Sequence, residues 1–277
     1  MPPLQVALQR GRHCKHRDTS GGRVMGFIGD VASNVGAAII LAALATLASI
    51  VPARRLWQIP KSNNSDYVIF FVPARDSVET RAYRLPVVGL GPVQAIAAVT
   101  PSLTRAYWRR RRDPIDVRLA EKDLKVSELR SSFVSMGGPS RNEATRKLLV
   151  KCSERLGVKQ EHGHPTISGD RISLRMPDSS WRSFGGLQID GSLQQVKKDY
   201  ALILRVANPW SSERGRCLVF SGVHTYGTAA AAQYFVQQQW KPKWWTRQEV
   251  MCLLEIEFDE GCVTGINEIE FRRIKRT

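Results

Sequence analysis

The sequence predicts an α/β fold: a largely parallel sheet with flanking helices, a C-terminal antiparallel hairpin, and one N-terminal transmembrane helix. Apolar runs of strand length alternate with helix-like segments over the last three quarters of the chain. Two of these strands lead directly into glycine-containing loops that precede helices, at residues 137–142 and 221–228. A charge-free run at residues 35–51 comes before all of them.

The charge-free run is predicted to span a membrane. Extended to residues 31–52, it reaches about the 20 residues that a bilayer core requires. Its many small residues are typical of packed transmembrane helices, and Arg54, Arg55 and Trp57 follow it, as is usual at a cytoplasmic interface. A signal peptide and a buried core helix are the alternatives. We expect a single-pass membrane protein whose C-terminal domain lies in the cytoplasm.

The composition also suggests where the parts of the chain begin and end. A start at Met25 leaves little positive charge before the apolar run and favours a cytoplasmic C-terminus, whereas the basic residues after Met1 oppose that orientation. The predicted parts are a disordered basic tail (1–30), the transmembrane helix (31–52), a linker (53–65) and one α/β domain (66–277).

The chain is strongly basic, with 41 Lys and Arg against 25 Asp and Glu and a formal charge of +16. This charge favours an acidic partner, which is a nucleic acid, an anionic membrane surface or a phosphorylated small molecule. Arg109, Arg110, Arg111 and Arg112 are candidates for contact with anionic lipid headgroups. The five cysteines are scattered without CxxC spacing, which argues against a disulfide framework or a structural zinc site. We predict no metal site and no cofactor.

Strands of the α/β domain are predicted from apolar runs that end at turn residues. Runs that are apolar on both faces are typical of central strands covered on both sides. The predicted central strands are Tyr67–Val72, Phe133–Met136, Ala201–Val206 and Cys217–Phe220. The other predicted strands are Ile115–Leu119, the edge strands Arg171–Met176 and Trp181–Phe184, and the hairpin Met251–Phe258 with Cys262–Arg272.

The stretch Ser132–Leu149 contains the first strand–turn–helix unit. Gly137-Gly138-Pro139 ends the strand, and Asn142 is a candidate N-cap of the helix. Such a unit presents backbone N–H groups and the positive helix end to an anion, and glycine allows close approach. Arg141 and Arg146 add positive charge. An ordinary tight turn is an equally good interpretation of this stretch taken alone.

The second unit joins a buried strand, the loop Ser221–Thr228 and an alanine-rich helix at residues 229–239. Ligands of open α/β sheets bind at the carboxyl ends of strands, so both loops face one crevice if their strands are neighbours. We therefore predict a shared site for a phosphate-bearing ligand. Its candidate residues are Gly137, Gly138, Arg141, Asn142, Arg146, His224, Thr225, Gly227 and Thr228.

The two loops resemble those of the SLOG superfamily, Rossmann-like nucleotide binders that include the LOG cytokinin-activating hydrolases and the Smf/DprA proteins. Gly137-Gly138 is similar to the first glycine turn, and Gly227-Thr228 to the Gly-Thr of the LOG motif PGGxGTxxE. At the two preceding motif glycines stand His224 and Thr225, and Ala231 stands at the catalytic glutamate. The resemblance implies a Rossmann-like nucleotide-binding fold. Because some superfamily members look like nucleotide sensors joined to membrane segments, it also implies a signalling or bacterial antiviral defence role.

Three functions remain open from the sequence. The first is a membrane-anchored sensor of a nucleotide or nucleotide-derived phosphate. The second is an enzyme acting on the N-glycosidic bond of a nucleotide or NAD-type substrate, with Asp199, Glu143 or His224 as acid, base or nucleophile. The third is a nucleic-acid-binding protein, which the basic charge and aromatic residues such as Trp210 and Trp244 favour.

Overall fold

The structure is a computed structural model in which the chain divides into two compact units, Met1–Leu47 and Ala48–Thr277. The elements below belong to the second unit. The predicted tail at 1–30, most of the predicted span at 31–52, and Arg109–Arg112 lie outside the described residues. Within the described part, no helix is both long enough and apolar enough to cross a membrane. The described residues are 46, 48–59, 68–73, 75–79, 84–107, 115–121, 123–161, 171–185, 188–190, 195–211, 215–259 and 262–274.

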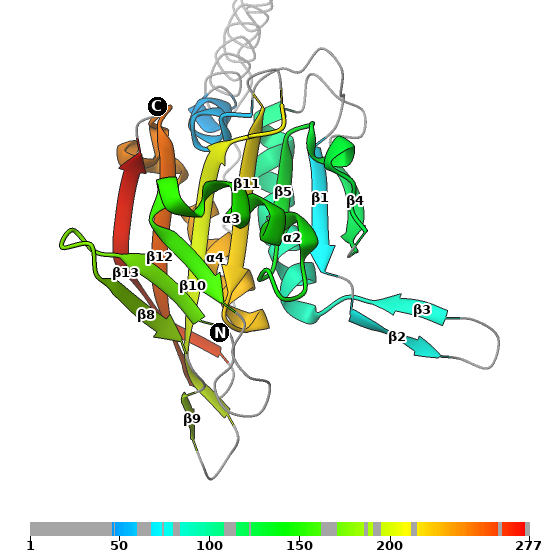
Figure 1. The fold of residues 1–277 in the computed structure, drawn as a ribbon. Coiled ribbons are helices and arrows are strands. Elements are labelled where there is room, and N and C mark those ends of the chain that lie inside the picture. Colours follow the sequence, from blue (N-terminus) through cyan, green and yellow to red (C-terminus); the bar gives the residue numbers. More distant parts are fainter. Residues whose placement is uncertain are drawn as a thin grey trace, which may run out of the picture. The chain divides into compact units, whose positions relative to one another are not determined.

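A mixed sheet runs through this unit (Figure 1). Its strands are β1 (Val68–Pro73), β4 (Ile115–Ala120), β5 (Phe133–Met136), β9 (Gln188–Asp190), β10 (Gln195–Ala207), β11 (Arg216–Gly222), β12 (Glu249–Asp259) and β13 (Cys262–Ile274). Their order is β13-β12-β10-β11-β5-β1-β4, and β9 pairs with β10. The neighbours β4, β1, β5 and β11 are parallel. Beyond β11, the strands β10, β12 and β13 each run antiparallel to the strand before them.

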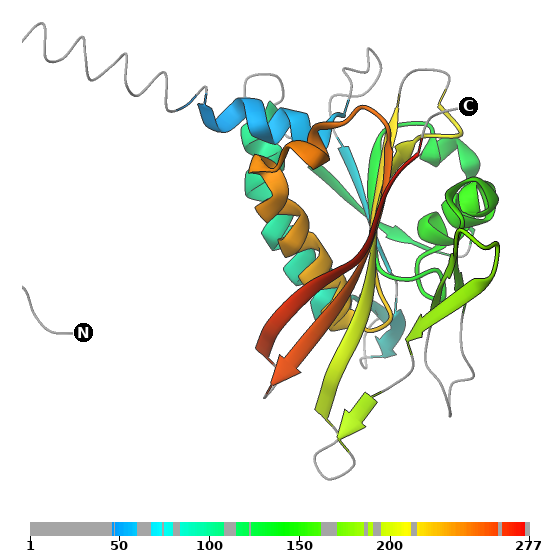
Figure 2. The same cartoon turned by 90° about the vertical axis from the view of Figure 1, so that its left-hand side faces the viewer.

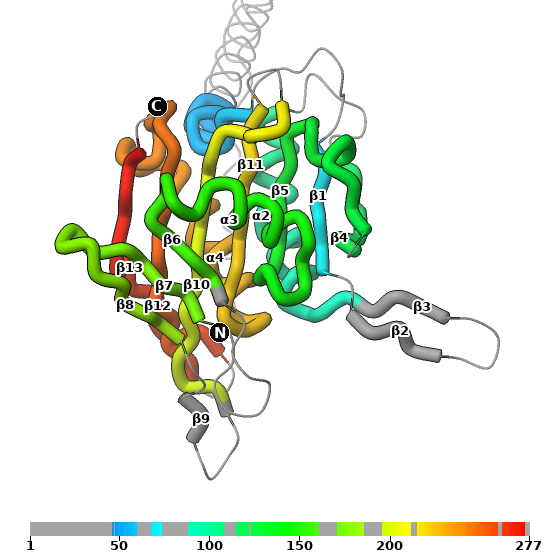
Figure 3. The backbone as a smooth tube through the Cα atoms, in the orientation of Figure 1, coloured from blue at the N-terminus to red at the C-terminus, as the bar shows by residue number. Residues whose placement is uncertain are grey.

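Helices cover both faces of this sheet. The α-helices are α2 (Leu90–Tyr107), α3 (Glu143–Leu156) and α4 (Thr225–Gln237), and residues 48–57 form a further helical stretch. The 3-10 helices are η1 (Val126–Leu129), η2 (Gln238–Trp240) and η3 (Pro242–Trp245). Figure 2 shows α2 and α4 side by side on one face and α3 on the other. One smaller antiparallel sheet pairs β2 (Arg75–Glu79) with β3 (Arg84–Val87). Another is formed by β6 (Val158–Glu161), β7 (Arg171–Arg175) and β8 (Trp181–Gly185), and Figure 3 shows the backbone of β7 and β8.

Alternating side chains of the strands build a separate apolar core on each face. Phe70 and Phe220 pack with α2 and α4 in one core. Their neighbours Phe71 and Val219 point to the opposite face and pack with α3, β6 and β7. This alternation follows from the two-residue period of a strand, and it explains why the runs in β1 and β11 are apolar at every position.

The predicted α/β class, the flanking helices and the C-terminal hairpin are confirmed. All four predicted central strands lie in the main sheet as β1, β5, β10 and β11. The parallel arrangement holds for β4, β1, β5 and β11, whereas β10 is antiparallel to both of its long neighbours. The predicted edge strands Arg171–Met176 and Trp181–Phe184 correspond to β7 and β8, which form a separate sheet with β6.

Residues 53–59, the described part of the predicted linker at 53–65, pack into the core of the domain. Ala53, Leu56 and Trp57 are completely buried. The Nε1 of Trp57 donates to the hydroxyl of Ser102 at 3.0 Å, and its ring meets the edge of Phe235 at 5.3 Å between centroids. Arginines beside a tryptophan resemble a membrane interface in sequence, but here the tryptophan fills a space between helices.

Arg205 of β10 anchors this helical stretch to the sheet through hydrogen bonds. Its guanidinium is buried and donates to the carbonyl oxygens of Leu56 at 2.6 Å, Trp244 at 2.8 Å and Thr246 at 2.6 Å. Burial lowers the pKa of Arg205 to about 9, which leaves it charged at neutral pH. Carbonyls near helix ends carry partial negative charge, so they stabilise this cation in place of a carboxylate.

Candidate ligand-binding site

The parallel strands β1, β5 and β11 end side by side, and a cavity lies at this edge of the sheet. The connection after β1 leads to α2 on one face, whereas the connection after β5 leads to α3 on the other. A reversal of this kind leaves a crevice at the carboxyl ends of the strands. The cavity has a volume of about 180 Å³. It is lined by Pro73, Gly89, Pro92, Gly137, Gly138, Ser140, Arg141, Gly222, Val223, His224, Thr225 and Thr228.

Both glycine loops line this cavity because β5 and β11 are hydrogen-bonded neighbours. The N–H of Gly137 donates to the carbonyl of Phe220 at 2.8 Å and thereby joins the two strand ends. Gly137 has a φ of 105°, a backbone conformation that costs glycine little and other residues much. The carbonyl of Gly138 accepts from the N–H groups of Arg141 and Asn142, so the loop is a closed turn against the cavity.

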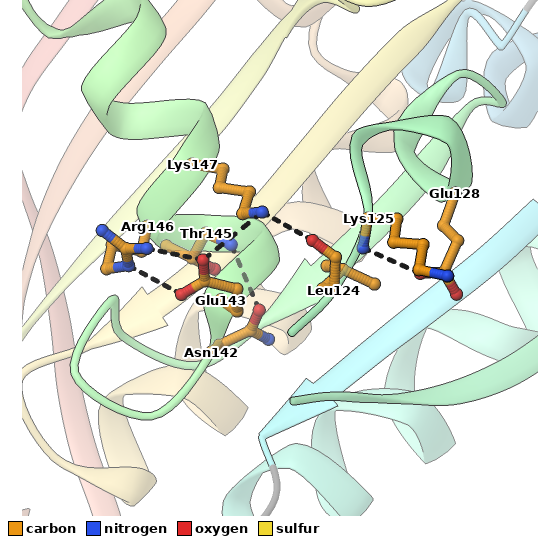
Figure 4. A network of polar contacts seen from close by, with 8 residues as sticks. All are labelled: Leu124, Lys125, Glu128, Asn142, Glu143, Thr145, Arg146 and Lys147. Carbon is orange, nitrogen blue, oxygen red and sulfur yellow. Dashed lines mark hydrogen bonds and ion pairs between the residues drawn. The ribbon is translucent and has the colours of Figure 1, made fainter. Parts of the chain in front are cut away.

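Asn142 supports the loop from behind and does not line the cavity. Its Oδ1 accepts from the N–H of Thr145 at 3.1 Å, which confirms the predicted N-cap of α3 (Figure 4). Its Nδ2 donates to the carbonyls of Phe71 and Met136 at 3.0 and 2.9 Å. Asn142 is completely buried, and these bonds tie β1, β5 and α3 together. Its role is to fix the shape of the site.

Arg141 and Arg146 differ in where they lie. Arg141 lines the cavity. Arg146 is outside the lining and forms two 2.6 Å hydrogen bonds with the carboxylate of Glu143 (Figure 4). The hydrogen bond from Arg146 is the main reason that the pKa of Glu143 is below its usual value. Lys147 completes this cluster with a hydrogen bond to the carbonyl of Leu124.

The second loop turns tightly at Gly222. A Cβ at this position would lie 2.2 Å from the carbonyl oxygen of His224 and 2.5 Å from the backbone nitrogen of Thr228. Both are backbone atoms that cannot move aside cheaply, so the turn requires glycine. The N–H of Gly222 donates to the hydroxyl of Thr228 at 3.0 Å. The end of β11 is thus tied to the start of α4.

A buried carboxylate occupies the start of α4. Asp199 of β10 is 1% exposed and accepts from the N–H of Gly227 at 2.7 Å and from the N–H of His224 at 3.1 Å. Burial raises the pKa of Asp199, while the nearby His224 and the backbone N–H groups act in the opposite direction. The N–H of Gly227, predicted to hold a phosphate, is therefore already bonded within the protein.

His224, Thr225 and Thr228 form the cavity wall at this end. The Nε2 of His224 is shielded from solvent and has no hydrogen-bond partner in the described part of the protein. The hydroxyl of Thr225 accepts from the N–H of Gly91 at 3.0 Å. A Cβ at Gly91 would lie 1.9 Å from the carbonyl oxygen of Thr225, so this glycine lets α2 and α4 begin in contact.

The predicted residues thus divide into two groups. Gly137, Gly138, Arg141, His224, Thr225 and Thr228 line the cavity, whereas Asn142, Arg146 and Gly227 do not. Of the residues considered for acid–base chemistry, His224 lines the cavity and Asp199 and Glu143 do not. The residues not predicted include Gly89 and Pro92, which precede or begin α2. The signal in the sequence was Gly89-Leu90-Gly91-Pro92, a glycine turn followed by a proline suited to a first helical turn.

No protein-family model, curated protein or solved structure matches the chain significantly. The geometry of this cavity is therefore what indicates a function. The features that matter are its place at the strand ends, its two glycine loops, and the distribution of charge along its walls.

Proposed function

We propose that the protein binds a nucleotide or nucleotide-derived phosphate in this cavity and serves as a membrane-anchored sensor of that ligand. The observation that carries the proposal is the convergence of both glycine loops on one cavity at the carboxyl edge of the parallel strands. Arg141 lies in the lining, and no Asp or Glu is among the described residues that line the cavity. A negatively charged ligand group therefore meets donors and a cation rather than a carboxylate.

The wall formed by residues 137–141 is the part best suited to a phosphate. The N–H of Gly138 has no protein acceptor in the described part of the chain, and the cationic residue Arg141 lines the same part of the cavity. Charge-assisted hydrogen bonds of this kind are shorter and stronger than neutral ones. The start of α3 follows the loop directly and adds the positive end of its dipole.

The volume of the cavity indicates how much of a nucleotide is enclosed. Typical ligand pockets have volumes of about 300–1,000 Å³, and this cavity has about 180 Å³. The space suits a phosphate with a sugar-sized group. We propose that the phosphate and sugar are enclosed, while the base extends toward the opening.

Binding fits the geometry better than cleavage of an N-glycosidic bond. That reaction needs an acid or base within hydrogen-bonding reach of the reacting atoms. Asp199 is occupied by backbone N–H groups, and Glu143 is paired with Arg146 outside the cavity. Ala231, at the position of the LOG glutamate, is buried in the core of α2 and α4. One departure from the SLOG pattern, Ala231, thus falls where catalysis would require a carboxylate.

The sensing role further requires the anchor. We propose that residues 31–52 hold the protein in a membrane, with the ligand-binding domain in the cytoplasm, because this run is uncharged and of bilayer length. Fractionation of the full-length protein tests this part. Release of the protein from membranes by alkaline carbonate, without detergent, would contradict the anchor and leave the binding proposal intact.

Calorimetric titration of inorganic phosphate and a panel of nucleotides into the detergent-solubilised protein tests the binding proposal. The panel includes cyclic nucleotides and ADP-ribose-type compounds. We expect saturable binding of at least one nucleotide and competition by inorganic phosphate. Binding to DNA or RNA with a steep salt dependence, and no binding of any nucleotide, would favour the nucleic-acid alternative instead.

A further inference from the structure

The two loops that line the cavity differ in charge, and this difference restricts the ligand. The first loop, residues 137–141, contributes the N–H of Gly138 and the cationic residue Arg141. The second loop contributes His224, Thr225 and Thr228, which carry an imidazole and two hydroxyl groups. Asp199 lies behind this second wall and bonds to the backbone of His224 and Gly227.

Asp199 takes the place that an external anion would occupy at the start of α4. A helix begins with N–H groups that lack acceptors within the helix, and these normally attract a ligand anion. Here the carboxyl oxygens of Asp199 accept from Tyr200, His224 and Gly227. A Cβ at Gly227 would lie 2.5 Å from Oδ2 of Asp199, so the carboxyl group is packed closely against the helix. A second ligand phosphate would find the Gly227 donor occupied and a buried carboxyl group behind the wall.

The second wall does suit uncharged hydrogen-bonding groups. Nε2 of His224 is buried and has no hydrogen-bond partner among the described residues, and a buried nitrogen left without a hydrogen bond is costly. Thr225 and Thr228 each use their oxygen to accept one backbone N–H, which leaves the hydroxyl proton of each available as a donor. Sugar hydroxyls, which both donate and accept, match these three groups.

We propose that the cavity binds its ligand in one orientation, and this proposal rests on the proposed function. One phosphate lies at residues 137–141, and a sugar hydroxyl lies at His224 and Thr225. A ligand with anionic groups at both ends is excluded. The ligand class is thus a nucleoside 5′-monophosphate or a related compound with one terminal phosphate. His224 is the residue that determines this specificity. Arg141, in contrast, recognises the phosphate common to all such ligands.

The test compares three probes by calorimetry with the full-length protein: inorganic phosphate, adenosine 5′-monophosphate and adenosine 3′,5′-bisphosphate. For the unmodified protein, we expect the monophosphate to bind at least tenfold more tightly than the bisphosphate. Equal or tighter binding of the bisphosphate would overturn the directional proposal. Failure of all three probes to bind would instead count against the proposed function, so the two failures are distinguishable.

Two variants sharpen the comparison. His224→Ala should weaken binding of the monophosphate about tenfold and leave inorganic phosphate unchanged, because only the sugar end loses a partner. Arg141→Ala should weaken both ligands by a similar factor. A His224→Ala variant that loses monophosphate and inorganic phosphate equally would contradict the assignment of His224 to the sugar end. The comparison of probes on the unmodified protein needs neither variant to fold.

Discussion

The carboxylate of Asp199 accepts a 2.7 Å hydrogen bond from the N–H of Gly227, across 28 positions of sequence. This contact joins an antiparallel strand to the first turn of α4 and supplies a cap that His224, the N-cap residue, does not supply with its own side chain. It allows α4 to begin at Thr225. The contact thereby brings Thr225 and Thr228 into a helical turn beside the cavity.

Replacing Asp199 should destabilise the fold. Asp199→Asn turns one acceptor into an NH₂ group that faces backbone donors, and we expect a loss of roughly 2 kcal/mol in the free energy of unfolding. The loss is partly offset, because burial of the charge is unfavourable and raises the pKa of Asp199. Urea unfolding followed by circular dichroism measures it. Asp259→Asn, at an exposed pair with Lys197, is the control and should change stability by less than about 1 kcal/mol.

Trp57 should be essential to the stability of the domain. Trp57→Ala removes a completely buried indole and its bond to Ser102, so we expect a loss of about 3–5 kcal/mol. The control is Val93→Ala on α2, whose side chain is 49% exposed and whose effect should stay within about 0.5 kcal/mol. Similar urea midpoints for the two variants would show that residues 53–59 are a linker after all.

Arg205 should not be replaceable by lysine. The planar guanidinium reaches three carbonyl oxygens at once, which an ammonium on a single stem does not reproduce. We expect Arg205→Lys to lower the free energy of unfolding by roughly 2–3 kcal/mol. Thermal unfolding of both variants measures the effect. Arg130→Lys, at an exposed position, is the control and should leave the free energy of unfolding unchanged. A neutral Arg205→Lys variant would contradict the role given to the three carbonyls.

Glu143 should make the stability of the protein depend on pH in the acidic range. Its hydrogen bond from Arg146 lowers the pKa of the carboxyl group in the folded state. A lowered carboxyl pKa contributes stability above the unfolded value of about 4.3, and this contribution is lost as pH falls through the folded value. Glu143→Gln should therefore lose less stability than the unmodified protein between pH 6 and pH 3. Parallel pH profiles of the urea midpoint would refute this account.

The sequence was informative where a signal was local. The strand Phe133–Met136, the turn Gly137-Gly138 and the cap Asn142 are adjacent in the chain, and each follows from local residue preferences. The shared cavity requires β5 and β11 to be neighbours in the sheet. The sequence alone did not show whether these two strands are neighbours. The direction of β10 could not be predicted, because a strand buried on both faces has the same apolar pattern in either direction.

The contacts that were missed are those between distant residues. The start of α4 depends on Asp199, and the core position of Trp57 depends on Ser102 and Phe235. No local pattern predicts such partners, since a carboxylate or an indole has the same identity at a membrane interface, in a linker or in a core. Arg141 and Arg146 were equivalent candidates for the same reason, and Glu143, three residues before Arg146, was the one available hint.

The contrast between Arg141 and Arg146 gives the most direct test of the central claim that the cavity binds a phosphate. Arg141 lines the cavity, whereas Arg146 is paired with Glu143 outside it. The measurement is calorimetric titration of adenosine 5′-monophosphate into the full-length protein, its Arg141→Ala variant and its Arg146→Ala variant. We expect Arg141→Ala to weaken binding by about 1–3 kcal/mol and Arg146→Ala to leave it nearly unchanged. Equal losses in both variants, or none in either, would contradict a phosphate site in this cavity.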